Sequence, residues 1–143
     1  MKLALMVLFS AVVPLFAGNV VVTYEPAVVE LTGKLDLQTF PGPPNYESIR
    51  NGDEIERHFY LRLDAPVDVL PRGEHPTIDN PEPERNVRVM QLVVGYSENE
   101  LFKHLRKIGE GGRVRILGTL FHRFTGHHHS RILLKVQKLE EVR

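Results

Sequence analysis

The chain has 143 residues, in which 18 Lys and Arg side chains balance 18 Asp and Glu side chains, with seven histidines and no cysteine. This length is typical of a single domain, and the lack of cysteine excludes a disulfide or a lipid-modified cysteine. Proteins that bind nucleic acid normally carry excess positive charge, so the zero formal net charge argues against nucleic acid as a partner.

The first residues have the pattern of a secretory signal peptide. Lys2 precedes a short apolar run, which ends in the small residues Ala17 and Gly18. This order is typical of a signal peptide, and the run is too short for a membrane-spanning helix. We predict a signal peptide over residues 1–18, export to the periplasm or the exterior, and no membrane span after cleavage; an uncleaved anchor or a buried strand is the alternative. Residues 19–143 are predicted to form one domain.

Alternating apolar and polar residues predict strands along the mature chain. The clearest is VVELTGKLDLQTF at residues 28–40, and others are expected over residues 58–63, 86–94, 113–121 and 131–139. The residues expected to face inward are Val29, Leu31, Gly33, Leu35, Leu37, Phe59, Leu61, Leu63, Val114, Ile116, Gly118, Leu120, Ile132, Leu134 and Val136.

Between the third and fourth strands the apolar period changes to that of a helix. Ser97 and Glu100 have the spacing of a capping box, and apolar residues recur at helical spacing from Leu101 to Ile108. Gly109 follows where a C-terminal cap belongs. One short amphipathic helix is therefore expected here.

Three strands, one helix and two strands is the element order of the oligonucleotide/oligosaccharide-binding fold, or OB-fold. Gly33 and Gly118 interrupt inward faces, where glycine weakens a strand unless the backbone bends or another chain passes close. We predict an all-β fold with one short helix, as a five-stranded OB-fold-like barrel (β-β-β-α-β-β); an open α+β sandwich is the alternative. The proline-rich residues 64–86 are expected to form an extended, solvated spacer.

In an OB-fold, the loops that join strands one and two and strands four and five flank the ligand face. Here these loops are residues 40–54 and residues 123–130, and the second contains three consecutive histidines. We expect both loops to form one patch. The predicted ligand-binding residues are Phe40, Asn45, Tyr46, Glu47, His122, Thr125, His127, His128 and His129.

Three segments carry a resemblance to a known family. TFPGPPNYES at residues 39–48, GTLFHRFTGHHHS at residues 118–130 and TYEPAVVELTGKL at residues 23–35 resemble a family of small exported bacterial domains, domain of unknown function 4431. The resemblance covers essentially the whole mature chain and implies a bacterial envelope setting. Some relatives resemble fusions with a lysozyme-inhibitor-like segment, which points to cell-wall biology. Relatives often carry cysteines at the places that Val21 and Asp68 hold here.

The histidines also raise the possibility of a metal site. In an extended hairpin His127 and His129 share one side while His128 lies on the other, so His127 and His129 are the candidate ligands for Zn or Cu. The carboxylates that could complete such a site are Glu47, Asp53 and Glu54. The spacing matches no established zinc motif. The alternative is structural, with imidazoles that hydrogen-bond to the facing loop.

The sequence contains no nucleophile elbow and no metalloprotease helix, so we predict no catalytic residues. The predicted function is that of an exported envelope binding module without a cofactor. It would recognise a glycan fragment or a partner protein through the face built by the first loop and the histidine hairpin. The alternative function is that of a Zn- or Cu-binding protein that uses the histidine hairpin.

Overall fold

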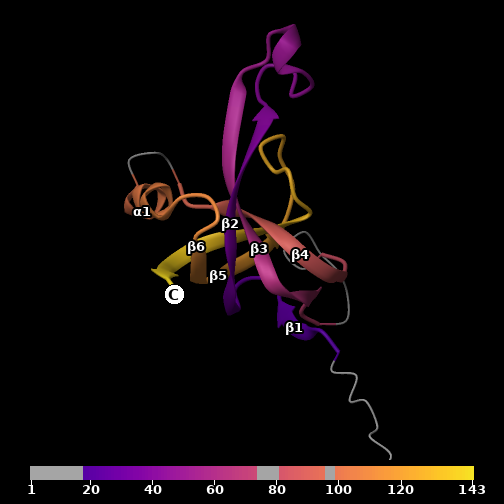
Figure 1. Cartoon of the computed structure of the whole chain (residues 1–143). Coiled ribbons are helices and arrows are strands. Elements are labelled where there is room, and N and C mark those ends of the chain that lie inside the picture. The colour runs from indigo at the N-terminus through magenta and orange to yellow at the C-terminus, as the bar shows by residue number, and fades with distance from the viewer. Residues whose placement is uncertain (1–17, 74–80, 96–98) are drawn as a thin grey trace, which may run out of the picture.

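The computed structural model describes residues 18–73, 81–95 and 99–143. Residues 1–17 of the predicted signal peptide lie outside this part, so the signal peptide stays a prediction. The described residues form six strands, one α-helix and one short 3-10 helix (Figure 1). These elements are β1 Val20–Thr23, β2 Val28–Pro41, η1 Ile49–Asn51, β3 Ile55–Leu70, β4 Glu84–Val93, α1 Glu100–Ile108, β5 Arg113–His122 and β6 Ile132–Glu141.

The six strands belong to one sheet, in the order β1-β3-β2-β5-β6-β4. β4 also pairs with β3, so β2, β3, β4, β5 and β6 each have two paired neighbours within this set. The β4–β6 pair is parallel and the other pairs of the set are antiparallel. The predicted mostly-β fold with one short helix is confirmed. The sequence missed β1, which pairs in parallel with β3, because its four residues, VVVT, show no apolar–polar alternation.

β2 changes its pairing partner at Gly33. Residues 28–34 pair with β5 and residues 33–41 pair with β3, so the two stretches overlap only at Gly33 and Lys34. A Cβ atom on Gly33 would lie 2.1 Å from the carbonyl oxygen of Arg62 on β3. Only glycine fits this close approach, as the interrupted inward face of the strand predicted.

Gly118 on β5 has a similar environment. A Cβ atom there would lie 2.1 Å from the carbonyl oxygen of Lys135 on β6. The β5–β6 register shifts between Leu117 and Gly118, which is the kind of irregularity at which interior glycines occur. Both glycines therefore allow neighbouring strands to approach at points where the sheet is irregular or changes partner.

The core consists of the inward side chains of the strands together with Tyr24, which follows β1, and Leu105 of α1. Nearly all the side chains predicted to face inward are buried, and Leu63 is partly buried against them. The prediction was wrong for Leu37, which is 38% exposed. Leu37 lies beyond the part of β2 that pairs with β5, so no second neighbouring strand covers it.

The N-cap of the helix lies two residues later than predicted. Asn99 is the N-cap, and its side-chain oxygen accepts a 2.8 Å hydrogen bond from the backbone N–H of Leu101. The prediction that Ser97 caps the helix was therefore wrong, and Ser97 itself lies outside the described residues. The predicted end is confirmed, because the N–H of Gly109 donates to the carbonyl of Leu105. Asn competes with Ser at this position because both can cap.

The proline-rich segment is less of a spacer than its composition predicted. β3 continues to Leu70, and two alternate residues near its end, Val67 and Val69, are buried in the core. Pro66 is accommodated because it lies within a register irregularity between β3 and β4, where a missing N–H does not break the ladder. The prediction of a solvated spacer was therefore wrong for residues 64–70.

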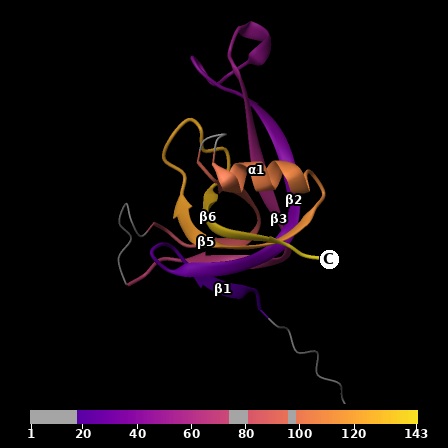
Figure 2. The same ribbon diagram turned by 90° about the vertical axis from the view of Figure 1, so that its left-hand side faces the viewer.

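Beyond the body of the sheet, β2 and β3 extend as a two-stranded projection (Figures 1 and 2). We call residues 37–41 and 55–59, which pair with each other, the outer ribbon. It carries the first loop at its tip; this loop was predicted over residues 40–54 but spans residues 42–54, because β2 continues to Pro41. The histidine hairpin, residues 123–131, rises beside it. In the described part of the chain, no helix has the length and apolar character needed to cross a membrane.

Candidate functional site

The histidine hairpin lies over one face of the outer ribbon. Strand alternation places Glu56, His58 and Tyr60 on the same face of β3, and Phe40 of β2 is the register partner of Glu56. The Phe40 ring lies 6.2 Å from the His58 ring and 5.9 Å from the Tyr60 ring, measured between centroids. This face therefore offers one carboxylate, one imidazole and two aromatic rings to the hairpin.

The Glu56 carboxylate lies at the centre of a group of imidazoles. Its Oε2 is 3.0 Å from Nε2 of His58 and 3.3 Å from Nε2 of His129. Its Oε1 is 2.5 Å from Nδ1 of His127. Burial acts to raise the pKa of Glu56, but the hydrogen bonds from the three imidazoles outweigh this effect and lower the pKa below its usual range. Glu56 is therefore an ionised carboxylate shared by three histidines.

Aromatic side chains fix the histidine rings in place. Phe40 stacks on His129, with ring centroids 3.9 Å apart and planes only 4° from parallel. The hydroxyl oxygen of Tyr46 lies 3.1 Å from Nε2 of His127, and the Tyr46 ring packs within 3.4 Å of where a Cβ of Gly126 would lie. The structure thus brings Phe40 and Tyr46 together with the hairpin, as the sequence predicted.

A buried glutamine on β4 holds the hairpin backbone. The Gln91 side chain donates to the carbonyl of His127 (2.9 Å) and accepts from the N–H of His129 (2.7 Å). Its own backbone N–H donates to Oγ of Ser130 (2.9 Å). Gln91 is only 2% exposed. Sequence reasoning missed its role, although a lone polar residue in the apolar run VMQLVV was the available signal.

His128 makes its hydrogen bonds within the hairpin and not to Glu56. Its Nδ1 accepts hydrogen bonds from the backbone N–H groups of Phe124 (3.1 Å) and Thr125 (3.3 Å). Burial first, and then the charges of neighbouring imidazoles, lower the pKa of His128. His127 and His129 both contact Glu56, as predicted, but residues 126 and 127 form a turn and not the extended chain on which that prediction rested. Thr125 contributes its backbone to this turn, since its carbonyl accepts from the N–H of His128.

The first loop is organised by Asp53, which is buried. Its carboxylate accepts hydrogen bonds from the backbone N–H groups of Ser48 and Glu47 (both 2.8 Å) and from the backbone and side-chain N–H groups of Asn45 (3.0 and 3.1 Å). These bonds, those from Ser48 and Glu47 foremost, lower the pKa of Asp53. Asp53 therefore shapes the loop and is not free to act as a metal ligand. Asn45, a predicted ligand-binding residue, is engaged in the same internal network.

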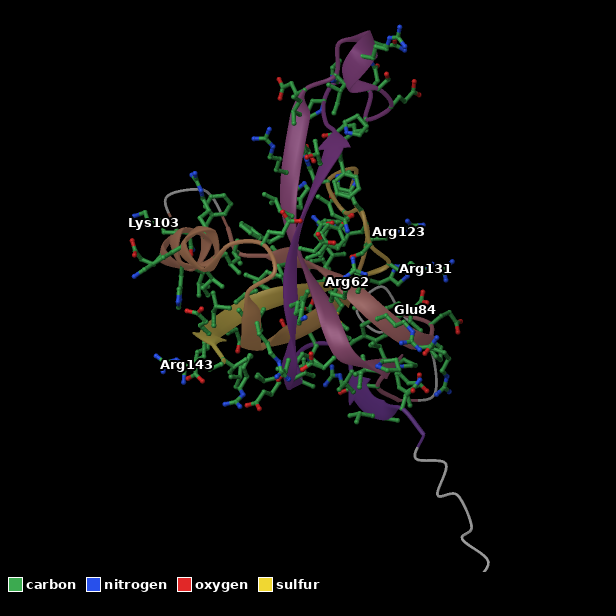
Figure 3. All side chains as sticks on the ribbon, in the orientation of Figure 1. Arg62, Glu84, Lys103, Arg123, Arg131 and Arg143 are labelled. Carbon is green, nitrogen blue, oxygen red and sulfur yellow. The ribbon has the colours of Figure 1, made fainter. Side chains whose placement is uncertain are left out.

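His122 lies in a separate group. Its Nε2 is 3.2 Å from a carboxylate oxygen of Glu84 at the start of β4, and Arg131 lies 3.5 Å from the other oxygen. Figure 3 shows Arg123 and Arg131 on the side of the hairpin that faces away from β2 and β3. The prediction grouped His122 with the hairpin histidines, but within the described residues its hydrogen bonds are to Glu84 and to the carbonyl of Arg123, and none joins it to the Glu56 cluster.

A cleft of 440 Å³ lies next to the cluster. It is found where β3 and β4 separate beyond their Tyr60–Gln91 pair. The side chains that matter most for its chemistry are Arg57, His58, Phe59, Phe102, His127 and His128. Phe59 and Phe102 meet edge to face, with ring centroids 6.2 Å apart. The cleft therefore combines an aromatic wall with cationic and hydrogen-bonding groups.

Within the part of the chain that the structure describes, one group could hold a metal ion. Single ligand atoms from Glu56, His58 and His129 all lie within 4.8 Å of one another. Of the predicted metal ligands only His129 belongs to this group. Glu56 and His58 were missed because they lie on a strand far from the hairpin in sequence, with Glu56 73 residues before His129. Their spacing, two residues apart on one strand face, was the only signal.

The mostly-β fold and the histidine-rich site can now be compared with known proteins. Residues 89–140 match a family described as a domain of unknown function, DUF4431. This match supports the resemblance over α1, β5, the histidine hairpin, the second half of β4 and most of β6. It leaves β2 and β3, and with them Glu56 and His58, outside the matched region. No curated protein and no solved structure matches the chain significantly.

Proposed function

We propose that this protein is an exported envelope module that binds an acidic glycan fragment on an OB-fold-like barrel. The pairings support the barrel, because they run from β2 through β3, β4, β6 and β5 back to β2, with α1 between β4 and β5. OB-folds bind their ligands on the second and third strands, between the two loops that flank them. The corresponding strands here are β3 and β4, flanked by the first loop and the histidine hairpin.

The observation that carries the proposal is the cleft over β3 and β4. In the proposed barrel this cleft would occupy the ligand site, and its lining has suitable chemistry. Arg57 offers a planar cation for a carboxylate, while Phe59 and Phe102 offer the apolar faces that small ligands pack against. A sugar ring that bears a carboxylate would use both features.

Calorimetric titration of the untagged chain from residue 19 with carboxylate-bearing peptidoglycan fragments tests this proposal. We expect Arg57→Ala and Phe102→Ala each to weaken binding by about 1–2 kcal/mol, as anchor residues do. Arg62→Ala is the matched control, because Arg62 lies on the same strand but pairs with Asp36 and does not line the cleft. Equal affinity of the Arg57→Ala and Arg62→Ala variants would contradict the proposal.

A partner protein is the second candidate ligand. Phe124 at the hairpin tip is 77% exposed, and an exposed aromatic residue beside a structured patch is a frequent anchor of protein interfaces. Phe124→Ala separates the two candidates, since Phe124 does not line the cleft. Loss of glycan binding in this variant would contradict the assignment of the glycan to the cleft.

Export is tested independently of the ligand. The order of charge, apolar run and small residues at the N-terminus supports cleavage before Gly18 or Asn19. Mass spectrometry of protein recovered from the envelope fraction should show a chain that begins at one of these residues. Recovery of a chain that retains Met1 would contradict the export proposal.

A further inference from the structure

We propose that Glu56, His58 and His129 form a binding site for a divalent transition-metal ion with the preferences of Zn²⁺. Two of these ligands, Glu56 and His58, come from β3, and the third comes from the histidine hairpin. The site goes beyond the proposed function, because only His58 of its three residues lines the cleft and zinc binding requires no glycan. It also differs from the pair His127 and His129 that the sequence predicted as metal ligands.

The distances between the candidate ligand atoms fit a tetrahedral ion. Bonds of about 2.0–2.1 Å place the ligand atoms of a tetrahedral zinc site roughly 3.4 Å apart. Oε2 of Glu56 lies 3.0 Å from Nε2 of His58 and 3.3 Å from Nε2 of His129, and all three atoms lie within 4.8 Å of one another. Two imidazoles and one carboxylate are a ligand set that zinc uses when its fourth position is left to another molecule.

The ligands are already held in position by neighbouring groups. Their side chains are only 13–24% exposed, and Phe40 stacks on the His129 ring. Nδ1 of His127 contacts the second oxygen of Glu56, and Nε2 of His127 contacts Tyr46. Hydrogen bonds to the residues that coordinate a metal ion orient those residues and raise the affinity for the ion. His127 would therefore act on the metal through Glu56.

A hydrogen-bonded latch between the hairpin and the ribbon is the competing explanation. A latch accounts for His127 and His129, because each joins the hairpin to Glu56 on β3. It does not require the hydrogen bond of His58 to Glu56, because both residues lie on β3; His58 meets the hairpin only through its ring, 5.2 Å from that of His129. The convergence of His58 on the same carboxylate oxygen as His129 is therefore the observation that favours a metal site.

Zinc titration of the untagged, chelator-stripped chain from residue 19 tests the site. We expect one equivalent of Zn²⁺ to bind, and Glu56→Gln, His58→Asn and His129→Asn each to weaken it on the order of 100-fold or more, since even outer partners cost 10–100-fold. His104→Asn and His122→Asn are matched controls. His104 lies on α1 and His122 pairs with Glu84, so both variants should retain full affinity.

His58→Asn is the decisive variant. It removes the His58 imidazole but leaves both contacts between the hairpin and Glu56, those of His127 and His129, in place. Thermal melts without metal will show whether each variant is folded. Co²⁺ loading adds a second readout, with the visible absorption of a four-coordinate ion in the parent and its loss in His58→Asn. Failure of the parent to bind zinc, or full affinity in a folded His58→Asn variant, would overturn the proposal.

Full zinc affinity in a folded His58→Asn variant would assign the metal to a site that does not include His58.

The zinc site and the glycan cleft can also fail separately. Arg57→Ala should retain zinc affinity, because Arg57 lines the cleft but is absent from the ligand group. Loss of zinc binding in a folded Arg57→Ala variant would contradict the assignment of the metal to Glu56, His58 and His129.

Discussion

The two halves of β2 are held in place by different interactions. Residues 28–34 pair with β5 and bury Val29 and Leu31 in the core. The half of β2 in the outer ribbon pairs with β3, and its Leu37 is 38% exposed. There the stabilising contacts come from the hairpin, through the stacking of Phe40 on His129. Apolar burial thus stabilises the body of the sheet, and aromatic and polar contacts stabilise the ribbon.

This difference predicts two kinds of response to substitution. A fully buried apolar side chain contributes about 1.5–3 kcal/mol, and the cooperative core transmits its loss to the whole fold. A hydrogen bond contributes about 1 kcal/mol net, and the hairpin can open locally while the sheet stays folded. Changes in the body should therefore lower global stability, whereas changes in the ribbon should alter the hairpin or the first loop.

The largest effect is expected for Gly33→Ala. The new Cβ would lie 2.1 Å from a backbone oxygen of β3, which cannot move without disturbing the sheet. We expect a loss of about 3 kcal/mol, the upper end of overpacking costs, measured by chemical denaturation. Gly126→Ala is the control, because its Cβ would meet only the movable Tyr46 ring at 3.3 Å. Equal stability of the two variants would show that the strands do not approach so closely.

Gln91→Leu should have the next largest effect. It replaces the amide by an apolar side chain of similar size and leaves the carbonyl of His127 and the N–H of His129 without their partner. Unsatisfied buried groups cost about 1–3 kcal/mol. Hydrogen exchange should show a loss of protection at the His129 amide that exceeds the change in the core strands. Unchanged protection there would mean that the hairpin is held without Gln91.

Acid should affect the first loop through Asp53. Its pKa is lower in the folded state than in the unfolded chain, so its stabilising contribution is present above the unfolded value of about 3.9. The contribution declines below that value and is lost as the pH falls through the folded pKa. NMR should show the amides of Glu47 and Ser48 changing together in this acid range. In Asp53→Asn this step should be absent, and its persistence would assign it to another carboxyl group.

The smallest effect is expected for Tyr46→Phe. It removes the hydroxyl contact with His127 but keeps the ring that packs on Gly126. Because this hydrogen bond is exposed, a loss of about 0.5 kcal/mol is expected, seen as a small shift in a thermal melt. Tyr46→Ala should cost more, since it also removes the ring. If Tyr46→Phe lost as much stability as Gln91→Leu, the exposed hydrogen bond of Tyr46 would matter as much as the buried ones of Gln91, contrary to this prediction.

The sequence by itself determined the features that depend on local periodicity. Alternation identified the buried faces of the strands, because successive side chains of an extended chain point to opposite sides. The inward glycines marked close approaches of strands for a similar local reason, since an interior glycine needs a backbone cause. Gly109 likewise ended the helix where its sequence predicted.

Only the tertiary structure decided what the histidines face. His127 and His129 contact Glu56, which lies 71 and 73 residues earlier in the chain, and no local period reports such a distance. The change of partner at Gly33 lets β2 and β3 project beyond the sheet, and this projection places Glu56 and His58 beneath the hairpin. Strand pairing, which depends on the whole chain, therefore built the site from residues whose local patterns only indicated strand faces.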